Sequence, residues 1–232
     1  MIPGFDFIDF AQTAGPVVAL VTVAAIIFAE SGLLIGFFFP GDSILFALGL
    51  LIQGTGNFKL DLNINFAILV LFIAATTGYY SGYLFGKKIG HHISNRPNSL
   101  LFHQKNVQRA QDFYDKYGGK TIMIARFIPI VRTFAPLIAG VVKMNQKSFM
   151  AFNLIGGAIW ITSVVYVGYF LGYYLRGMGI DIDTIILPAI ALILIVSVSP
   201  AIYQLAKDKK QRIAIWNTTK SELKKLFKKR NK

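Results

Sequence analysis

Four charged residues stand inside long apolar stretches of the sequence, where a charge is expensive to bury. They are Glu30 and Asp42 in the first third of the chain, and Arg126 and Arg132 in its second half. A single charge at the centre of a membrane helix costs about 2.5–3.5 kcal/mol on insertion scales. Two acids and two bases at such places can neutralise one another, exchange protons or bind a charged ligand.

The two arginines predict the binding of an oxyanion. A guanidinium group stays protonated and presents a planar fork that matches phosphate oxygens. Arg126 and Arg132 lie on either side of Pro129. Because proline interrupts a helix, the two side chains can converge on one ligand. The chemistry therefore predicts a carrier for an anionic, phosphate-bearing substrate.

Glu30 and Asp42 predict either proton coupling or a role as partners of the arginines in the empty site. Carboxyl groups in a low-dielectric site can exchange protons near neutral pH. The purely structural alternative is a pair of salt bridges that holds two segments together. That alternative does not explain why prolines and glycines accompany the charges.

Composition places these charges in a polytopic membrane protein. Of the 232 residues, 54% are hydrophobic, 15% are charged and none is cysteine, whereas a soluble domain has roughly 25% charged residues. A disordered chain, a disulfide scaffold and a cysteine-based zinc site are excluded. Three uncharged stretches, residues 66–86, 149–175 and 184–206, each reach the ~20 residues needed to cross the hydrocarbon core.

Two further apolar stretches, residues 16–53 and 121–142, are interrupted and carry the four charges. We interpret each as a re-entrant hairpin, because irregular backbone at membrane depth must be buried in protein or line a wet cavity. A pair of kinked spanning helices is the alternative. The residues expected to form the hairpins are Pro40, Gly41, Pro129 and Pro136.

Basic residues outside the apolar stretches predict the topology. Segment 87–120 carries seven Lys or Arg residues against two acids, and residues 207–232 carry eleven against two. By the positive-inside rule both regions face the cytoplasm, which gives a cytoplasmic C-terminus. Without a folded basic module, the tail is not expected to bind nucleic acid.

An internal repeat supports a transporter architecture. The motif Gly-Tyr-x-x-Gly occurs at residues 82–86 and again at 168–172, each time after an interrupted apolar stretch. The loop charges give the two copies opposite orientations, as in transporters built from inverted repeats. We therefore expect an all-α polytopic fold. A membrane domain of residues 1–206 would contain a first repeat at about 14–90, a second at about 117–176 and a final span at 184–206. Residues 207–232 would form a basic cytoplasmic tail.

Several motifs point to a known family. They include Glu30-Ser31-Gly32, Phe39-Pro40-Gly41-Asp42-Ser43 and Arg126-Phe127-Ile128-Pro129-Ile130-Val131-Arg132-Thr133. Over about residues 10–205 the sequence resembles the DedA family of bacterial membrane proteins, which is related to lipid scramblases that share the VTT domain. The family often has Asp directly after the glycine at position 78, where this sequence has Tyr79, so that position receives no charge role.

The resemblance implies a lipid carrier of the bacterial cytoplasmic membrane, similar to undecaprenyl-phosphate transporters. The family's functional positions match Arg126 and Arg132 as phosphate-binding residues, and Glu30 and Asp42 as acids for proton coupling or charge pairing. We expect movement of a lipid phosphate, first of all undecaprenyl phosphate, between leaflets. A less selective phospholipid scramblase and a non-transporting structural or regulatory protein are the alternatives.

Enzymatic activity, a metal and a cofactor are not expected. The sequence lacks a recognisable constellation of a nucleophile with its base, and the three histidines, at positions 91, 92 and 103, have no acid or cysteine cluster beside them. The expected partners are the anionic lipid phosphate and the surrounding membrane lipids. The residues leave a monomer and a homo-oligomer both open.

Overall fold

The computed structural model describes residues 14–32, 41–54, 59–93, 98–99, 102–103, 111–112, 114 and 116–178. These residues belong to one compact unit, Met1–Ile193; the second unit, Leu194–Lys232, lies outside them. Pro40, the predicted final span at 184–206, the basic tail and the side chains of His91, His92 and His103 also lie outside the described residues.

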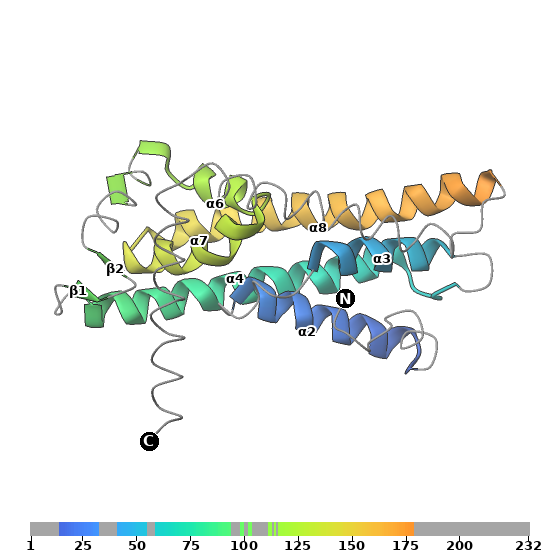
Figure 1. Cartoon of the computed structure of the whole chain (residues 1–232), viewed down its shortest axis with the longest axis horizontal. Helices are drawn as coiled ribbons and strands as arrows, with labels where there is room; N and C mark the ends of the chain where they lie inside the picture. The colour runs from blue at the N-terminus through green and yellow to red at the C-terminus, as the bar shows by residue number, and fades with distance from the viewer. Residues whose placement is uncertain are drawn as a thin grey trace, which may run out of the picture. The chain divides into compact units, whose positions relative to one another are not determined.

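Two long helices, α4 (Ile64–Ile93) and α8 (Gln146–Gly177), form the frame of the unit (Figure 1). Both are long and apolar enough to cross a membrane, and they contain the predicted spans 66–86 and 149–175. They run antiparallel, because Gln146 donates to the hydroxyl of Tyr80 at 2.6 Å, whereas Tyr166 donates to Asn65 at 2.8 Å.

The end of α4 differs from the prediction. The helix does not end where the uncharged stretch ends at Gly86 but continues through Lys87 and Lys88 to Ile93. The predicted basic loop 87–120 therefore begins as helix. Lysine and isoleucine are compatible with a helix interior, so a change of polarity alone does not end one. α8 begins at a conventional cap, because Asn145 accepts hydrogen bonds from the amides of Lys147 and Ser148.

Both interrupted stretches contain two short helices instead of one continuous helix. The first stretch contains α2 (Pro16–Gly32) and α3 (Gly41–Gln53). The second contains α6 (Lys120–Ala125) and α7 (Pro129–Val141), with a break at residues 126–128. Pro129 begins α7, where a missing N–H costs nothing, and Ile128 before it is extended, as a residue before proline prefers.

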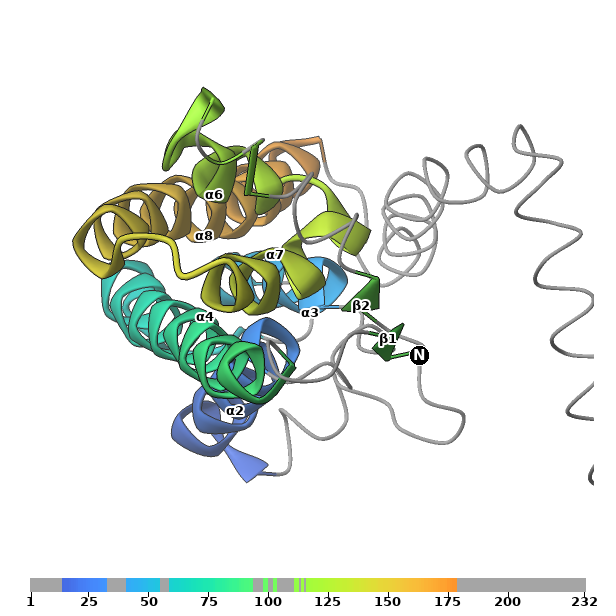
Figure 2. The same cartoon turned by 90° about the vertical axis from the view of Figure 1, so that its left-hand side faces the viewer.

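The short helices pack on the long ones in an exchanged pattern (Figures 1 and 2). α2 packs on α4 and α6 packs on α8, but α3 packs mainly on α8 and α7 packs mainly on α4. The exchanged contacts depend on glycine: a β-carbon at Gly168 would overlap the Phe46 carbonyl of α3, and one at Gly140 would overlap the Tyr83 carbonyl of α4. Small residues allow the backbones to approach this closely.

Each Gly-Tyr-x-x-Gly motif faces the short helix that comes from the other half of the chain. Gly86 lies against the backbone of Leu137 on α7, and Gly82 faces Pro136 on the same helix. Gly172 faces Gln53 at the end of α3, with its β-carbon position 3.3 Å from Gln53 Cβ. The two motifs therefore make equivalent contacts.

Buried apolar side chains form two clusters. The first contains Ile27, Leu48, Leu71 and Trp160, and the second contains Tyr79, Tyr83, Ile122 and Phe149. The outer faces of α4 and α8 remain apolar and exposed. Exposed side chains of this kind include Phe66, Leu69, Ile73, Phe85, Ile155, Val167 and Phe170. An apolar surface of this extent fits contact with lipid.

Candidate functional site

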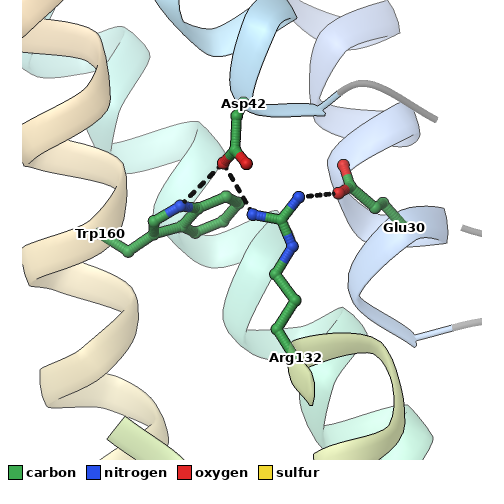
Figure 3. Close-up of polar contacts among 4 residues, drawn as sticks. All are labelled: Glu30, Asp42, Arg132 and Trp160. Atoms are coloured by element: carbon green, nitrogen blue, oxygen red, sulfur yellow. Dashed lines mark hydrogen bonds and ion pairs between the residues drawn. The ribbon is translucent and has the colours of Figure 1, made fainter. Parts of the chain in front are cut away.

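Arg132 joins three helices through its guanidinium group (Figure 3). Its Nη2 forms an ion pair with Glu30 of α2, and its Nη1 forms another with Asp42 of α3 at 2.7 Å. Arg132 lies in the first turn of α7 and Asp42 in the first turn of α3. The start of two helices and the end of α2 therefore meet at one guanidinium.

Trp160 of α8 completes this arrangement. Its indole Nε1 donates to Asp42 Oδ1 at 3.0 Å, and the Arg132 guanidinium carbon lies 4.9 Å from the centre of its ring. A cation over an aromatic face is stabilised by the ring quadrupole. Asp42 thus accepts from both Arg132 and Trp160, and a long helix contributes to the ion-pair network as well as the three short ones (Figure 3).

The first turn of α3 lies directly against the carboxyl group of Glu30. A β-carbon at Gly41 would overlap Glu30 Oε2, so no other residue fits there without displacing the acid. Glu30 itself is 4% exposed. Gly41 therefore permits the close approach of α3 to Glu30 that the shared ion pair with Arg132 requires.

Arg126 is bound by neutral groups. It is 2% exposed, and its Nη2 donates to Asn153 Oδ1 and to the carbonyl of Ala75. Asn153 is held in turn by donating to the Thr76 carbonyl at 3.0 Å. The guanidinium carbon lies 4.2 Å from the ring centre of Tyr79. Among the described residues, no carboxylate forms an ion pair with Arg126.

Trp160 also connects the two arginines. The guanidinium carbon of Arg126 lies 5.9 Å from its ring centre, and that of Arg132 lies 4.9 Å away. The four charges predicted from the sequence are therefore gathered in one region, but they are not paired two by two. Arg132 forms an ion pair with each of the two acids, and Arg126 forms none with a described carboxylate.

Three buried polar atoms around this region have no hydrogen-bond partner within the described part of the chain. They are Glu30 Oε2, Tyr79 Oη and Arg126 Nε. Buried polar groups are nearly always hydrogen-bonded, so unpaired atoms on Arg126 and on the adjacent Tyr79 point to a site that a polar ligand or water completes. Arg126 and Tyr79 lie in contact with each other, whereas Glu30 Oε2 lies against the backbone of Gly41.

Sequence reasoning missed three residues of this site. Tyr79 received no charge role because it stands where the family often has Asp, and Trp160 is one uncharged residue of the predicted span 149–175. Asn153 could have been found, because an amide inside an uncharged 27-residue stretch is costly unless it is hydrogen-bonded. Asn153 and Trp160 are seven residues apart, which places both on one face of α8.

The residues predicted to form the hairpins lie at different places in the helices: two begin a helix and one lies inside a helix. Gly41 begins α3 and Pro129 begins α7, whereas Pro136 lies inside α7 and packs against Gly82 of α4. In the described residues no group of three His, Cys, Asp or Glu side chains is placed to hold a metal ion.

Comparisons with known proteins agree with the motifs. The VTT domain matches residues 39–170 of the chain. Protein DedA of Escherichia coli K12 is 37% identical over 185 residues, which cover 80% of this chain and 81% of DedA. Inner membrane protein YqjA of the same strain is 36% identical over 149 residues, covering 63% of this chain and 64% of YqjA.

An uncharacterized membrane protein of Mycobacterium tuberculosis H37Rv is 37% identical over 150 residues, which cover 65% of this chain and 64% of that protein. No solved structure matches the chain significantly. The matched residues 39–170 include Asp42, both arginines and Trp160. The chain therefore belongs to the DedA family of membrane proteins, which carry the VTT domain.

Proposed function

We propose that this protein moves a lipid phosphate, undecaprenyl phosphate first of all, between the leaflets of the bacterial inner membrane. The observation that carries the proposal is Arg126, a buried cation held only by neutral groups among the described residues. Burying an unpaired charge is strongly unfavourable, so a fold that retains one is poised to bind an anion. A phosphomonoester matches the guanidinium fork in charge and geometry.

The second arginine gives the site a way to respond to protons. In the empty site Arg132 is occupied by Glu30 and Asp42. Protonation of either acid would weaken its hold, so that Arg132 could turn to the phosphate beside Arg126. The substrate's arrival and the acids' protonation would then be linked, which couples lipid movement to a proton gradient.

We further propose that the two halves of the chain form an inverted repeat of a re-entrant hairpin followed by a spanning helix. The exchanged packing of α3 on α8 and of α7 on α4 supports this arrangement, because each short helix has an equivalent partner. So does the antiparallel course of α4 and α8. The basic loops and tail support a cytoplasmic C-terminus, and the similarity to inner membrane protein YqjA supports the inner membrane.

The proposal is tested with the purified full-length chain in liposomes that contain undecaprenyl phosphate. A phosphatase added outside hydrolyses only the outer-leaflet phosphomonoester, so hydrolysis beyond the outer pool measures transbilayer movement. Arg126→Gln and Arg132→Gln are expected to abolish this movement, and Lys147→Gln, an exposed residue outside the site, serves as the control. Retained movement in the Arg126→Gln variant would overturn the proposal.

The same assay separates a carrier from a scramblase. Excess phosphatidylethanolamine or phosphatidylglycerol is expected to leave the hydrolysis rate unchanged, and an imposed pH gradient is expected to change it. Competition by these phospholipids together with indifference to the gradient would assign the less selective scramblase activity instead.

A further inference from the structure

A pocket lies where α4, the end of α7 and the start of α8 meet, and none of the four charges of the candidate site lines it. Its volume is about 410 Å³, and it is lined by Tyr83, Lys87, Lys143, Met144, Asn145 and Gln146. Lys87 and Lys143 are both exposed, and neither forms an ion pair with a described residue. The pocket therefore combines two available ammonium groups with an aromatic and a thioether side chain.

Lys143 adopts a conformation that lysine rarely takes. Its φ is +54°, in the left-handed region. It follows α7 in a turn where Met144 donates to the Ala139 carbonyl and Lys143 to the Gly140 carbonyl. Glycine is the usual residue at this position of such a helix end, because it adopts the conformation without strain. A lysine there is unfavourable for the backbone, and it places an ammonium group at the edge of the pocket.

A second pocket lies at the other end of α8. Its volume is about 510 Å³, and it is lined by Gln53, Tyr173, Tyr174, Arg176, Gly177 and Met178. Arg176 is exposed and has no ion pair within the described part of the chain. The pocket again combines a cation with aromatic rings and a methionine.

The two pockets share one feature of the exchanged packing. The first is lined by Tyr83 and Lys87 of α4 and by the turn that joins α7 to α8, and the second lies where α8 and α3 end. In each, a long helix meets the short helix from the other half of the chain (Figure 1).

The positions of the pockets along α8 match the two surfaces of a membrane. At 1.5 Å per residue, Gln146 and Tyr174 are separated by about 42 Å along the helix. A bilayer with its headgroup regions is about 40–45 Å thick. Lys87 follows directly after the uncharged stretch 66–86, and Arg176 follows directly after the uncharged stretch 149–175. Trp160 lies midway between the pockets along α8, so if α8 crosses the bilayer along its normal, the arginine site lies near the middle of the membrane.

We propose that these pockets are docking sites for the phosphate-bearing headgroup of a lipid, one at each membrane surface. This inference rests on the proposed function and extends it: the headgroup binds at Lys87 and Lys143, or at Arg176, before and after it occupies Arg126. Lysine and arginine supply the charge-assisted hydrogen bonds to phosphate oxygens. Tyrosine, with one polar and one apolar end, suits the boundary between headgroup and acyl chain.

The methionines allow all three sites to be observed in one experiment. Met144 lines the first pocket, Met178 lines the second, and the Met150 sulfur accepts from Asn153, which binds Arg126. The full-length chain, labelled with ¹³C at the methionine methyl groups, is titrated in micelles with dihexanoyl phosphatidic acid. Its headgroup is a phosphomonoester. We expect saturable shifts of the Met144 and Met178 signals.

Variants assign each shift to its pocket. Lys87→Gln is expected to raise the lipid concentration at the midpoint of the Met144 shift about tenfold, because one charge-assisted hydrogen bond is lost. The midpoint of the Met178 shift should stay unchanged. Arg176→Gln is expected to do the reverse. Lys147→Gln and Lys59→Gln are exposed lysines outside the pockets, and they should leave both midpoints unchanged.

Two further titrations identify the ligand. Dihexanoylglycerol, which lacks the phosphate, should not shift either signal, and equal shifts with it would overturn the proposal. Inorganic phosphate should bind much more weakly than the lipid, and equal binding would contradict a lipid headgroup site.

The result also separates this inference from the proposed function. A shift of Met150 without shifts of Met144 and Met178 would overturn the two docking pockets while leaving the central site intact. Shifts of Met144 and Met178 in a protein that does not move undecaprenyl phosphate would support the pockets and contradict the transport proposal.

Discussion

Replacing Arg132 with methionine tests how strongly the ion pairs hold the short helices together. The side chain of Arg132 is 12% exposed, and those of Glu30 and Asp42 are 4% and 18% exposed. Methionine keeps much of the apolar volume but leaves both acids without their cation. Asp42 keeps its hydrogen bond from Trp160, whereas Glu30 loses its only ion-pair partner in the described residues.

The expected loss follows from this geometry. Removing one partner of a buried ion pair costs about 3–5 kcal/mol, because an uncompensated charge stays behind. Glu30→Gln alone should cost about 1.5–3 kcal/mol, since Arg132 keeps Asp42 as its partner. If the effects were independent, the double variant would lose the sum. Because Glu30→Gln removes the stranded charge, we expect the double variant to be no less stable than Arg132→Met, with a coupling energy of at least about 1.5 kcal/mol.

The measurement is the free energy of unfolding in mixed micelles, obtained by titration with dodecyl sulfate and followed by far-ultraviolet circular dichroism. The wild type, both single variants and the double variant form a complete cycle. A loss below about 1 kcal/mol for Arg132→Met would refute the reasoning, since exposed pairs have values of that size. A coupling energy near zero would show that Glu30 and Arg132 do not interact in the folded protein.

Three other variants extend the test. Arg126→Met should change the free energy of unfolding by less than about 2 kcal/mol, because removal of an unpaired buried charge offsets the lost hydrogen bonds. The same variant should nevertheless stop lipid movement in liposomes. Trp160→Phe keeps the ring but removes the donor to Asp42, so the same titration should show a loss of about 1–2 kcal/mol. Gly168→Ala should lower stability by about 1–3 kcal/mol because its β-carbon overlaps α3. The control Gly177→Ala, with nothing within 4 Å of its β-carbon position, should be neutral in that measurement.

Sequence patterns predicted the two long helices and the interruption before α7. Uncharged runs of more than 20 residues contain the cores of α4 and α8, since only a helix satisfies every backbone group in lipid. Pro129 predicted the break before α7, because its ring fixes the backbone and restrains Ile128. The end of α4 was wrong by seven residues, because a lysine pair ends an apolar run without ending a helix.

The pairing of the charges could not be predicted. Glu30 and Arg132 are 102 residues apart, and Asp42 and Arg132 are 90 apart, so their contact depends on which helix faces meet in three dimensions.

The pairing also determines which variants can test a purely structural role of the charges. Exchanging the two charges, by Glu30→Arg together with Arg132→Glu, would place a glutamate at position 132 beside Asp42. The repulsion between these two acids means that the exchange is expected to fail even if the pairs are purely structural. Arg126, with no acid beside it in the described residues, is the informative position.

The exchange of short helices determines when the protein can fold during its synthesis. α3 packs mainly on α8, and Asp42 has its ion pair with Arg132, 90 residues later in the chain. At roughly 5–20 residues per second, the ribosome needs about 5–18 s to supply that partner. During this interval α3 has reached the membrane without the helix that covers it. The face of α3 that packs on α8 therefore stays uncovered until the second half of the chain has been made, so the first half cannot complete its own packing.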